Sequence, residues 1–141
     1  MEKIKQIKIL SLWIFVLPLV ALNLCLFISV NYNLLENTIF MVDQIGRTAF
    51  TIPYIDGGVS ISRTARTYPA YLVFKPAMII TAILLIRYWL ATDKLVQNII
   101  SDPIKKNRFL IFGILSAIFL ILHSIFLGIS FENDLYKFFR R

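Results

Sequence analysis

Three long apolar stretches constrain this chain more than any other feature. Residues 9–30 and 109–130 each run for 22 positions without a Lys, Arg, Asp or Glu, and residues 70–91 form a third stretch with a cation near each end. About 20 apolar residues in a helix cross the ~30 Å hydrocarbon core of a bilayer, because each residue rises by ~1.5 Å. Helices also satisfy their own backbone hydrogen bonds in that core. We therefore predict an all-α integral membrane protein with three transmembrane helices, at about 9–30, 70–91 and 109–130.

Composition agrees with this class. The chain is 58% hydrophobic, with a mean hydropathy of +0.75, whereas a soluble domain is roughly 45–50% apolar. At this length we expect one membrane domain over residues 1–141. The net charge is +7, and the basic residues sit at the ends of the apolar stretches. This favours anionic lipid headgroups as partners and argues against nucleic acid.

The polarity of the first stretch's flanks and of the segments between the stretches predicts their structure. We expect the first stretch to be a retained helix, not a cleaved signal peptide, because it is too long and no small-x-small site follows it. The 39-residue loop 31–69 is mixed and polar. Charges interrupt its part 34–52, so a short helix or strand against the membrane surface is expected there. The basic connection 92–108 is expected to carry an amphipathic turn, formed by Leu95, Val96, Ile99 and Ile100, that stops before Pro103.

The density of positive charge predicts the orientation. Lys3, Lys5 and Lys8 precede the first stretch, and the second loop is denser in Lys and Arg than the first loop. The positive-inside rule then places the N-terminus and the second loop in the cytoplasm and the first loop outside. The pattern points to no particular membrane.

A short motif precedes the second stretch. It is Ile61-Ser62-Arg63-Thr64-Ala65-Arg66-Thr67-Tyr68-Pro69, and Phe74 follows it. This motif resembles the Frag1/DRAM/Sfk1 family, in which an Ile-Ser pair, a Thr, a small residue and a Pro precede the second helix at the same spacing. The resemblance is best over residues 53–90, and it covers the N-terminal half of the family fold. This chain has Ala65 where many relatives have Gly, and Ala70 where some have Glu.

The resemblance implies a polytopic membrane protein linked to lipids. Members of that family act in lipid remodelling of glycosylphosphatidylinositol anchors, in plasma-membrane lipid organisation and phosphoinositide signalling, and in autophagy at lysosomal membranes. Because the family fold has more helices than this chain, the resemblance also implies a shortened relative, or one that pairs with copies of itself or with another subunit.

The same motif supplies candidate lipid- or ligand-binding residues. Arg63 and Arg66 could hold a phosphate group through two parallel hydrogen bonds each. Ser62 and Thr64 could cap turns at the membrane surface. The alternative is a structural loop that closes the outer face of the helices. A second candidate patch is basic, and its expected role is topology and headgroup attraction; it comprises Lys105, Lys106 and Arg108.

The third stretch carries the remaining candidates. His123 is the only histidine, and it could be an axial haem ligand, a proton relay or a catalytic base. A neutral His bonded to a neighbouring helix is the alternative, and it is favoured because no second partner stands at a useful spacing. Gly113 and Ala117 are four apart, as are Ser124 and Gly128, a spacing that lets another helix approach closely.

Three functions remain open at this point. The first is a non-enzymatic accessory component that binds lipid or a partner, with other membrane subunits or a homo-oligomer as its assembly. The second is an enzyme that remodels lipid anchors or acyl chains, with Asp56, Ser62 or the arginines as reactive groups. The third is a subunit of an oligomeric transporter. The sequence has no nucleophile–base pair, nucleotide-binding loop or metal-ligand spacing, so it favours the first and predicts no cofactor, no metal site and no catalytic residue.

Overall fold

A computed structural model describes residues 2–35, 38–40, 55, 61–96 and 103–128. These residues form helices and turns, and none of them lies in a strand. Three helices are long and apolar enough to cross a membrane, as the three stretches predicted, and this supports an integral membrane protein. The elements are α1 (Glu2–Val30), the 3-10 helix η1 (Tyr32–Leu35), α3 (Ile61–Thr64), α4 (Ala70–Val96) and α5 (Pro103–Phe126).

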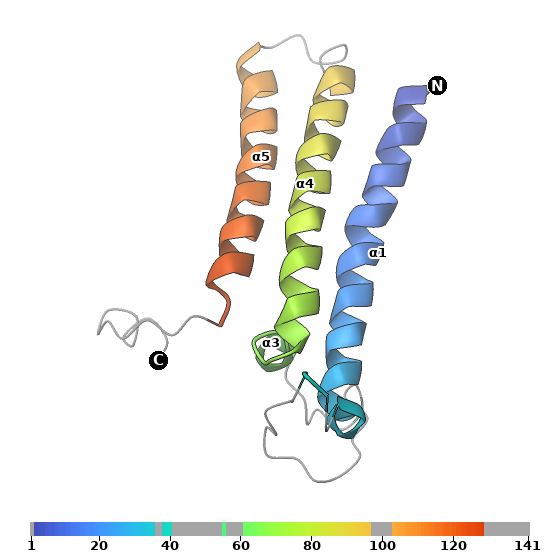
Figure 1. Ribbon diagram of the computed structural model, residues 1–141. Helices are drawn as coiled ribbons and strands as arrows, with labels where there is room; N and C mark the ends of the chain where they lie inside the picture. The colour runs from blue at the N-terminus through green and yellow to red at the C-terminus, as the bar shows by residue number, and fades with distance from the viewer. Residues whose placement is uncertain (1, 36–37, 41–54, 56–60, 97–102, 129–141) are drawn as a thin grey trace, which may run out of the picture.

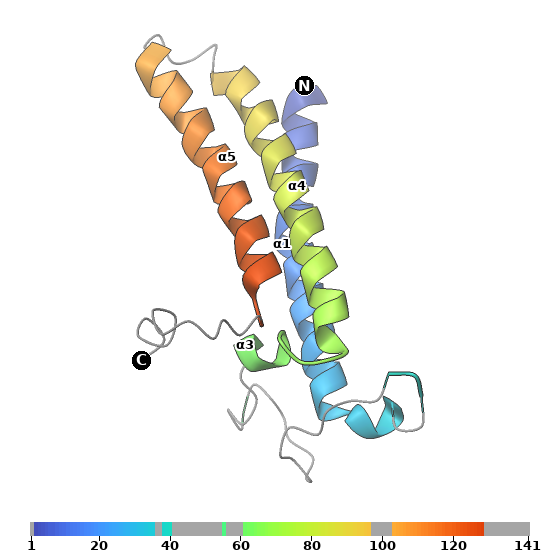
Figure 2. The ribbon, with the colours of Figure 1, turned by 60° about the vertical axis from the view of Figure 1, so that its left-hand side comes forward.

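Helix α4 lies between the other two long helices and packs against both of them. Among the described residues, α1 and α5 make no comparable contact with each other. The start of α1, the end of α4 and the start of α5 share one end of the molecule, whereas η1 and α3 lie at the other (Figures 1 and 2). We call the first of these the basic end. Its described cations are Lys3, Lys5, Lys8, Arg87, Lys94 and Arg108.

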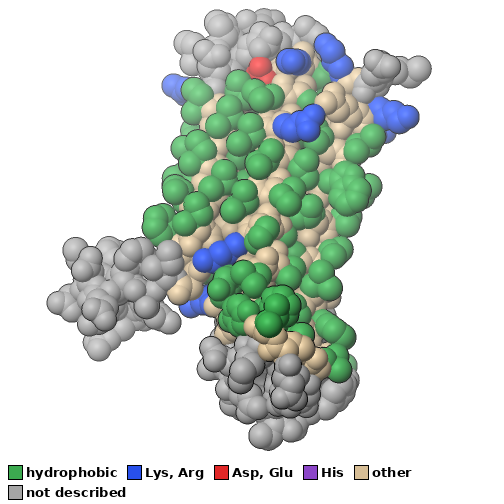
Figure 3. All heavy atoms as spheres, in the orientation of Figure 1, with side chains coloured by type: hydrophobic (Ala, Val, Ile, Leu, Met, Phe, Trp, Pro, Cys, Tyr) green, Lys and Arg blue, Asp and Glu red, His purple; other side chains and the backbone are tan. Residues whose placement is uncertain are grey.

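Small side chains fill the helix contacts, and large ones face outward. Ala82 and Ala117 have no exposed surface, whereas Phe15 and Phe112 are each 68% exposed. Figure 3 shows hydrophobic side chains over the middle of the molecule, with most Lys and Arg side chains of that face at the top. This distribution is expected in lipid, where small residues let helix backbones approach and the surroundings are as apolar as Leu.

The long helices extend beyond the predicted hydrocarbon crossings. Helix α1 begins at Glu2, and α4 continues through Asp93 and Lys94 to Val96. Leu95 and Val96 therefore belong to α4, not to a separate interfacial turn, while Ile99 and Ile100 lie outside the described residues. Pro103 is the first residue of α5, a position where its missing N–H costs no helical hydrogen bond.

Helix α5 ends at Phe126, before the predicted position 130. Gly128 follows with φ +87°, a left-handed conformation that glycine adopts without strain and that commonly terminates helices. The backbone N–H of Leu127 donates to the carbonyl of His123 at 2.9 Å in the last turn. Most of the predicted surface segment 34–52, together with Asp56, lies outside the described residues.

Candidate functional site

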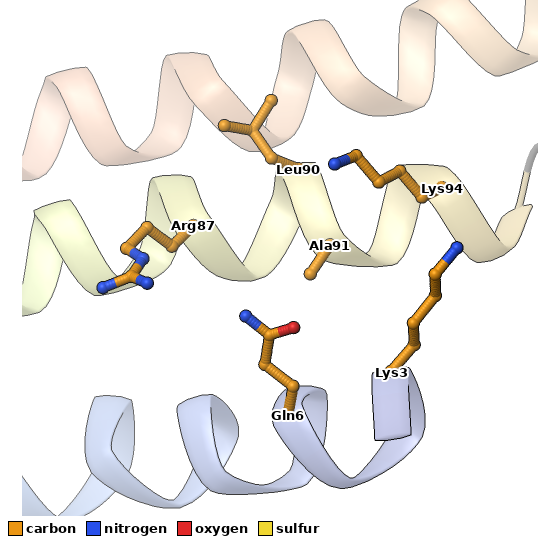
Figure 4. A pocket seen from close by; sticks show the side chains of 6 residues that line it. All are labelled: Lys3, Gln6, Arg87, Leu90, Ala91 and Lys94. Carbon is orange, nitrogen blue, oxygen red and sulfur yellow. The ribbon is translucent and has the colours of Figure 1, made fainter. Parts of the chain in front are cut away.

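Two adjoining pockets open between α1 and α4 at the basic end. The first has a volume of about 230 Å³ and is lined by Lys3, Gln6, Arg87, Leu90, Ala91 and Lys94 (Figure 4). The second has a volume of about 470 Å³ and is lined by Lys5, Gln6, Ile9, Leu10 and Arg87. Gln6 and Arg87 line both pockets, which therefore adjoin, and we call the two together the basic cleft.

Helical spacing explains why these residues line one space between the two helices. Lys3, Gln6 and Leu10 are three and four residues apart, so they share one face of α1. Arg87, Ala91 and Lys94 follow the same spacing on α4. Since α1 packs along α4, the two faces meet, and the side chains of Gln6 and Lys3 reach from α1 toward α4 (Figure 4).

The cleft is cationic and carries no acid among its lining residues. Four cations line its two parts: Lys3, Lys5, Arg87 and Lys94. Within the described residues none of these four forms an ion pair. Asp93, the neighbour of Lys94, is only 7% exposed, lines neither pocket and has an interaction of its own. Like charges gathered in this way repel one another, so an anion in the cleft would be stabilised.

The motif that precedes α4 lies at the opposite end. Thr64 and Ala65 are buried, and Ala65 belongs to an apolar cluster with Cys25, Ala70 and Phe74. The Cys25 thiol donates a hydrogen bond to the Ala70 carbonyl at 3.3 Å, which ties α1 to the start of α4. The buried half of the motif therefore packs α3 against α1 and α4, as expected of a structural loop.

The exposed half of the motif is described only at Ser62 and Arg66, so the predicted phosphate site stays a prediction. Ser62 is exposed and has an interaction of its own, and the side chain of Arg63 lies outside the described residues. Arg66 is exposed and lies beside Gly128, since a Cβ on that glycine would be 3.5 Å from the Arg66 Cβ. A cation here is near the C-terminus of α5, where the helix dipole favours positive charge.

A second cation reaches the same helix end from α4. The Lys75 ammonium donates to the carbonyl of Ile125 at 3.4 Å and lies 5.6 Å from the centre of the Tyr71 ring. The hydroxyl of Ser124 donates in return to the Lys75 carbonyl at 3.4 Å. Lys75 therefore donates to a backbone carbonyl at the end of α5.

The small residues of α5 face α4 of the same chain. Gly113 lies under the Trp89 ring, and Ala117 and Ser124 are fully buried. Gly128 lies after the helix and does not continue this row. His123 is exposed on α5, and the part of the chain that the structure describes brings no group of three His, Cys, Asp or Glu side chains together.

The cleft was not a candidate on sequence grounds. The cations that line it were assigned to topology and interface anchoring, and Gln6 carried no signal beyond its helical spacing from Lys3. Of the predicted basic patch, Arg108 is exposed on α5 and lines neither pocket. Lys105 and Lys106 lie in the first turn of α5, and their side chains are outside the described residues.

Comparison of the chain with family models, curated proteins and solved structures gave no match. The resemblance to the Frag1/DRAM/Sfk1 family therefore stays a prediction that rests on the motif alone.

Proposed function

We propose that this protein is a non-enzymatic component of a membrane that holds anionic lipid at its basic end. The observation that carries the proposal is the gathering of cations from all three long helices at one end, where neither pocket has an acid in its lining. A Lys or Arg near a membrane surface attracts anionic headgroups by on the order of 1 kcal/mol. Several such residues at one level select anionic over zwitterionic lipid.

The proposal includes an orientation. With the basic end in the cytoplasm, the start of α1 and the connection between α4 and α5 obey the positive-inside rule. The motif and α3 then face the opposite side. Reporter enzymes fused to the N-terminus and inserted in the connection 97–102 test this orientation, and activity of either reporter on the outer side would contradict it.

The enzyme alternative needs a reactive group at the depth of the lipid headgroups. Of its candidates, Ser62 lies in α3 at the end away from the basic cleft, and Asp56 lies outside the described residues. His123 is exposed on α5, and among the described residues it belongs to no group of three His, Cys, Asp or Glu side chains. Lipid composition unchanged after joint replacement of Asp56, Ser62 and His123 would set this alternative aside.

A partner subunit belongs to the proposal as a second component. The small residues Gly113 and Ala117 already face α4, so a partner helix would contact the larger apolar side chains on the outside of α1, α4 or α5. Purification from native membranes, with mass spectrometry of the proteins and lipids that co-purify, tests both components. Retention of zwitterionic and anionic lipids in the proportions of the source membrane would contradict lipid selection.

A further inference from the structure

We propose that the basic cleft between α1 and α4 is a discrete site for the phosphate group of an anionic lipid, with Arg87 as its deepest cation. This inference rests on the proposed function and makes it specific. In place of a diffuse attraction of anionic headgroups to every cation at the basic end, it assigns one binding site to the lipid phosphate.

The cleft brings charged and apolar side chains together in one open space, and its four cations are exposed. Its polar side chains come from two helices: the cations Lys3 and Lys5 and the amide of Gln6 on α1, and the cations Arg87 and Lys94 on α4. Each of its two parts has a volume many times that needed for one water molecule. Apolar residues form the remaining walls, among them Leu90 and Ile9, so the glycerol and the first acyl carbons of a lipid would meet an apolar surface beside the charged groups.

The position of Arg87 separates this site from a surface patch. It stands seven residues before Lys94 on α4, about 10 Å further along the helix axis toward the membrane interior. A cation at that depth is costly unless its charge reaches the interface or meets an anion. A planar guanidinium donates two parallel hydrogen bonds to phosphate oxygens. Lys3 and Lys94, at the outer end of the cleft that we call its mouth, add positive charge.

A zwitterionic lipid fits the same cleft poorly. Its phosphate is accompanied by a choline ammonium, which Lys3 and Lys94 at the mouth would repel. Free inorganic phosphate shares the anion but lacks the glycerol and acyl chains that the apolar wall would contact. The cleft therefore favours the phosphate of an anionic lipid over both.

The test compares two double variants of the full chain that remove the same charge. Arg87→Gln with Lys94→Gln removes two cations of the cleft. Lys8→Gln with Arg108→Gln removes two exposed cations of the basic end that line neither pocket. Binding of phosphatidylglycerol, phosphatidylcholine with the same acyl chains, and inorganic phosphate is measured in detergent by native mass spectrometry and by the shift in unfolding temperature.

We expect the wild-type chain to bind phosphatidylglycerol preferentially. The affinity of the control variant for phosphatidylglycerol should fall about fivefold for each charge removed, as expected for diffuse attraction. The affinity of the cleft variant should fall by a further factor of about ten or more, since hydrogen bonds between charged groups disappear as well. Arg87→Lys keeps the charge but lacks the planar guanidinium. Its affinity for phosphatidylglycerol should lie between those of the wild-type chain and the cleft variant.

The outcomes separate the two proposals. Equal losses in the two double variants would overturn the discrete site while leaving the lipid-binding function intact. Wild-type binding that does not distinguish the two lipids would overturn the function as well. Equal stabilisation by inorganic phosphate alone would identify a soluble anion as the ligand and overturn the lipid site. If the cleft variant does not fold, Lys3→Gln with Lys94→Gln takes its place in the same comparison.

Discussion

The contact between Gly113 and Trp89 makes the sharpest prediction about packing. A Cβ placed on Gly113 would lie 2.3 Å from Cδ2 of the indole, 2.5 Å from Cγ and 2.8 Å from Cε2. Carbon atoms in ordinary contact are about 3.5–4.0 Å apart. In the variant Gly113→Ala, α5 would therefore have to move away from α4 by about 1.2–1.7 Å, or Trp89 would have to leave its place.

Either movement would cost free energy. The three atoms belong to a rigid ring near its attachment to the backbone, and the ring also stacks edge-on with Phe109 at a centroid distance of 5.0 Å. Overpacking of this kind costs about 1–3 kcal/mol, and the rigid ring favours the upper part of that range. The better helix propensity of Ala offsets about 1 kcal/mol of this cost. We expect Gly113→Ala to lower the free energy of unfolding by about 2 kcal/mol.

Reversible unfolding in mixed micelles of a mild detergent and SDS, followed by near-ultraviolet circular dichroism, measures this loss. The control Phe112→Leu changes an outward-facing side chain and should stay within about 0.5 kcal/mol of the wild-type chain. In a Trp89→Leu background the same Gly113→Ala change should be neutral or stabilising. A Gly113→Ala variant as stable as the wild-type chain would refute the close approach of α4 and α5.

Three further outcomes follow from single contacts. Cys25 is 1% exposed and bonded to the Ala70 carbonyl, so a membrane-permeant maleimide should leave it unmodified until SDS unfolds the chain; prompt labelling in mild detergent would contradict the packing of α1 on α4. Lys75→Met should lower the free energy of unfolding by about 0.5–1 kcal/mol, because the C-terminal turn of α5 loses its cation; an SDS titration with no difference, or with an equal loss in Lys75→Arg, would contradict this role. His123→Leu places an apolar group on an exposed position and should change stability by less than about 0.5 kcal/mol in the same titration; a much larger loss would mean that His123 holds a contact inside the protein.

The number and approximate positions of the long helices could be predicted because hydrocarbon imposes a length. Their ends could not, since hydropathy marks where a helix crosses an apolar layer and says nothing of the turns beyond it. Asp93 and Lys94 are polar and still helical in α4. In α5 the helix stops at Phe126 although Leu127 and Ile129 continue the apolar stretch, because Gly128 takes up a left-handed conformation.

The candidate site could not be predicted because it depends on contacts between distant segments. Lys3 lies near the start of α1 and Lys94 near the end of α4, far apart in the sequence, and only the packing of α1 along α4 brings their faces together. The small residues of α5 illustrate the same limit. Their spacing indicated that some helix could approach, but not that α4 is that helix or that Trp89 would lie over Gly113.

The seam between α1 and α4 differs in character along its length. At the end near α3 it is closed by an apolar cluster that includes Cys25, Ala65 and Phe74. At the basic end the same seam opens into a cleft whose lining cations repel one another. The apolar end is packed by side chains of the protein itself, whereas at the basic end the proposed anion would offset the repulsion between the lining cations. A lipid phosphate bound there would close the seam along its full length, and the composition of the membrane would then affect the rigidity of the protein.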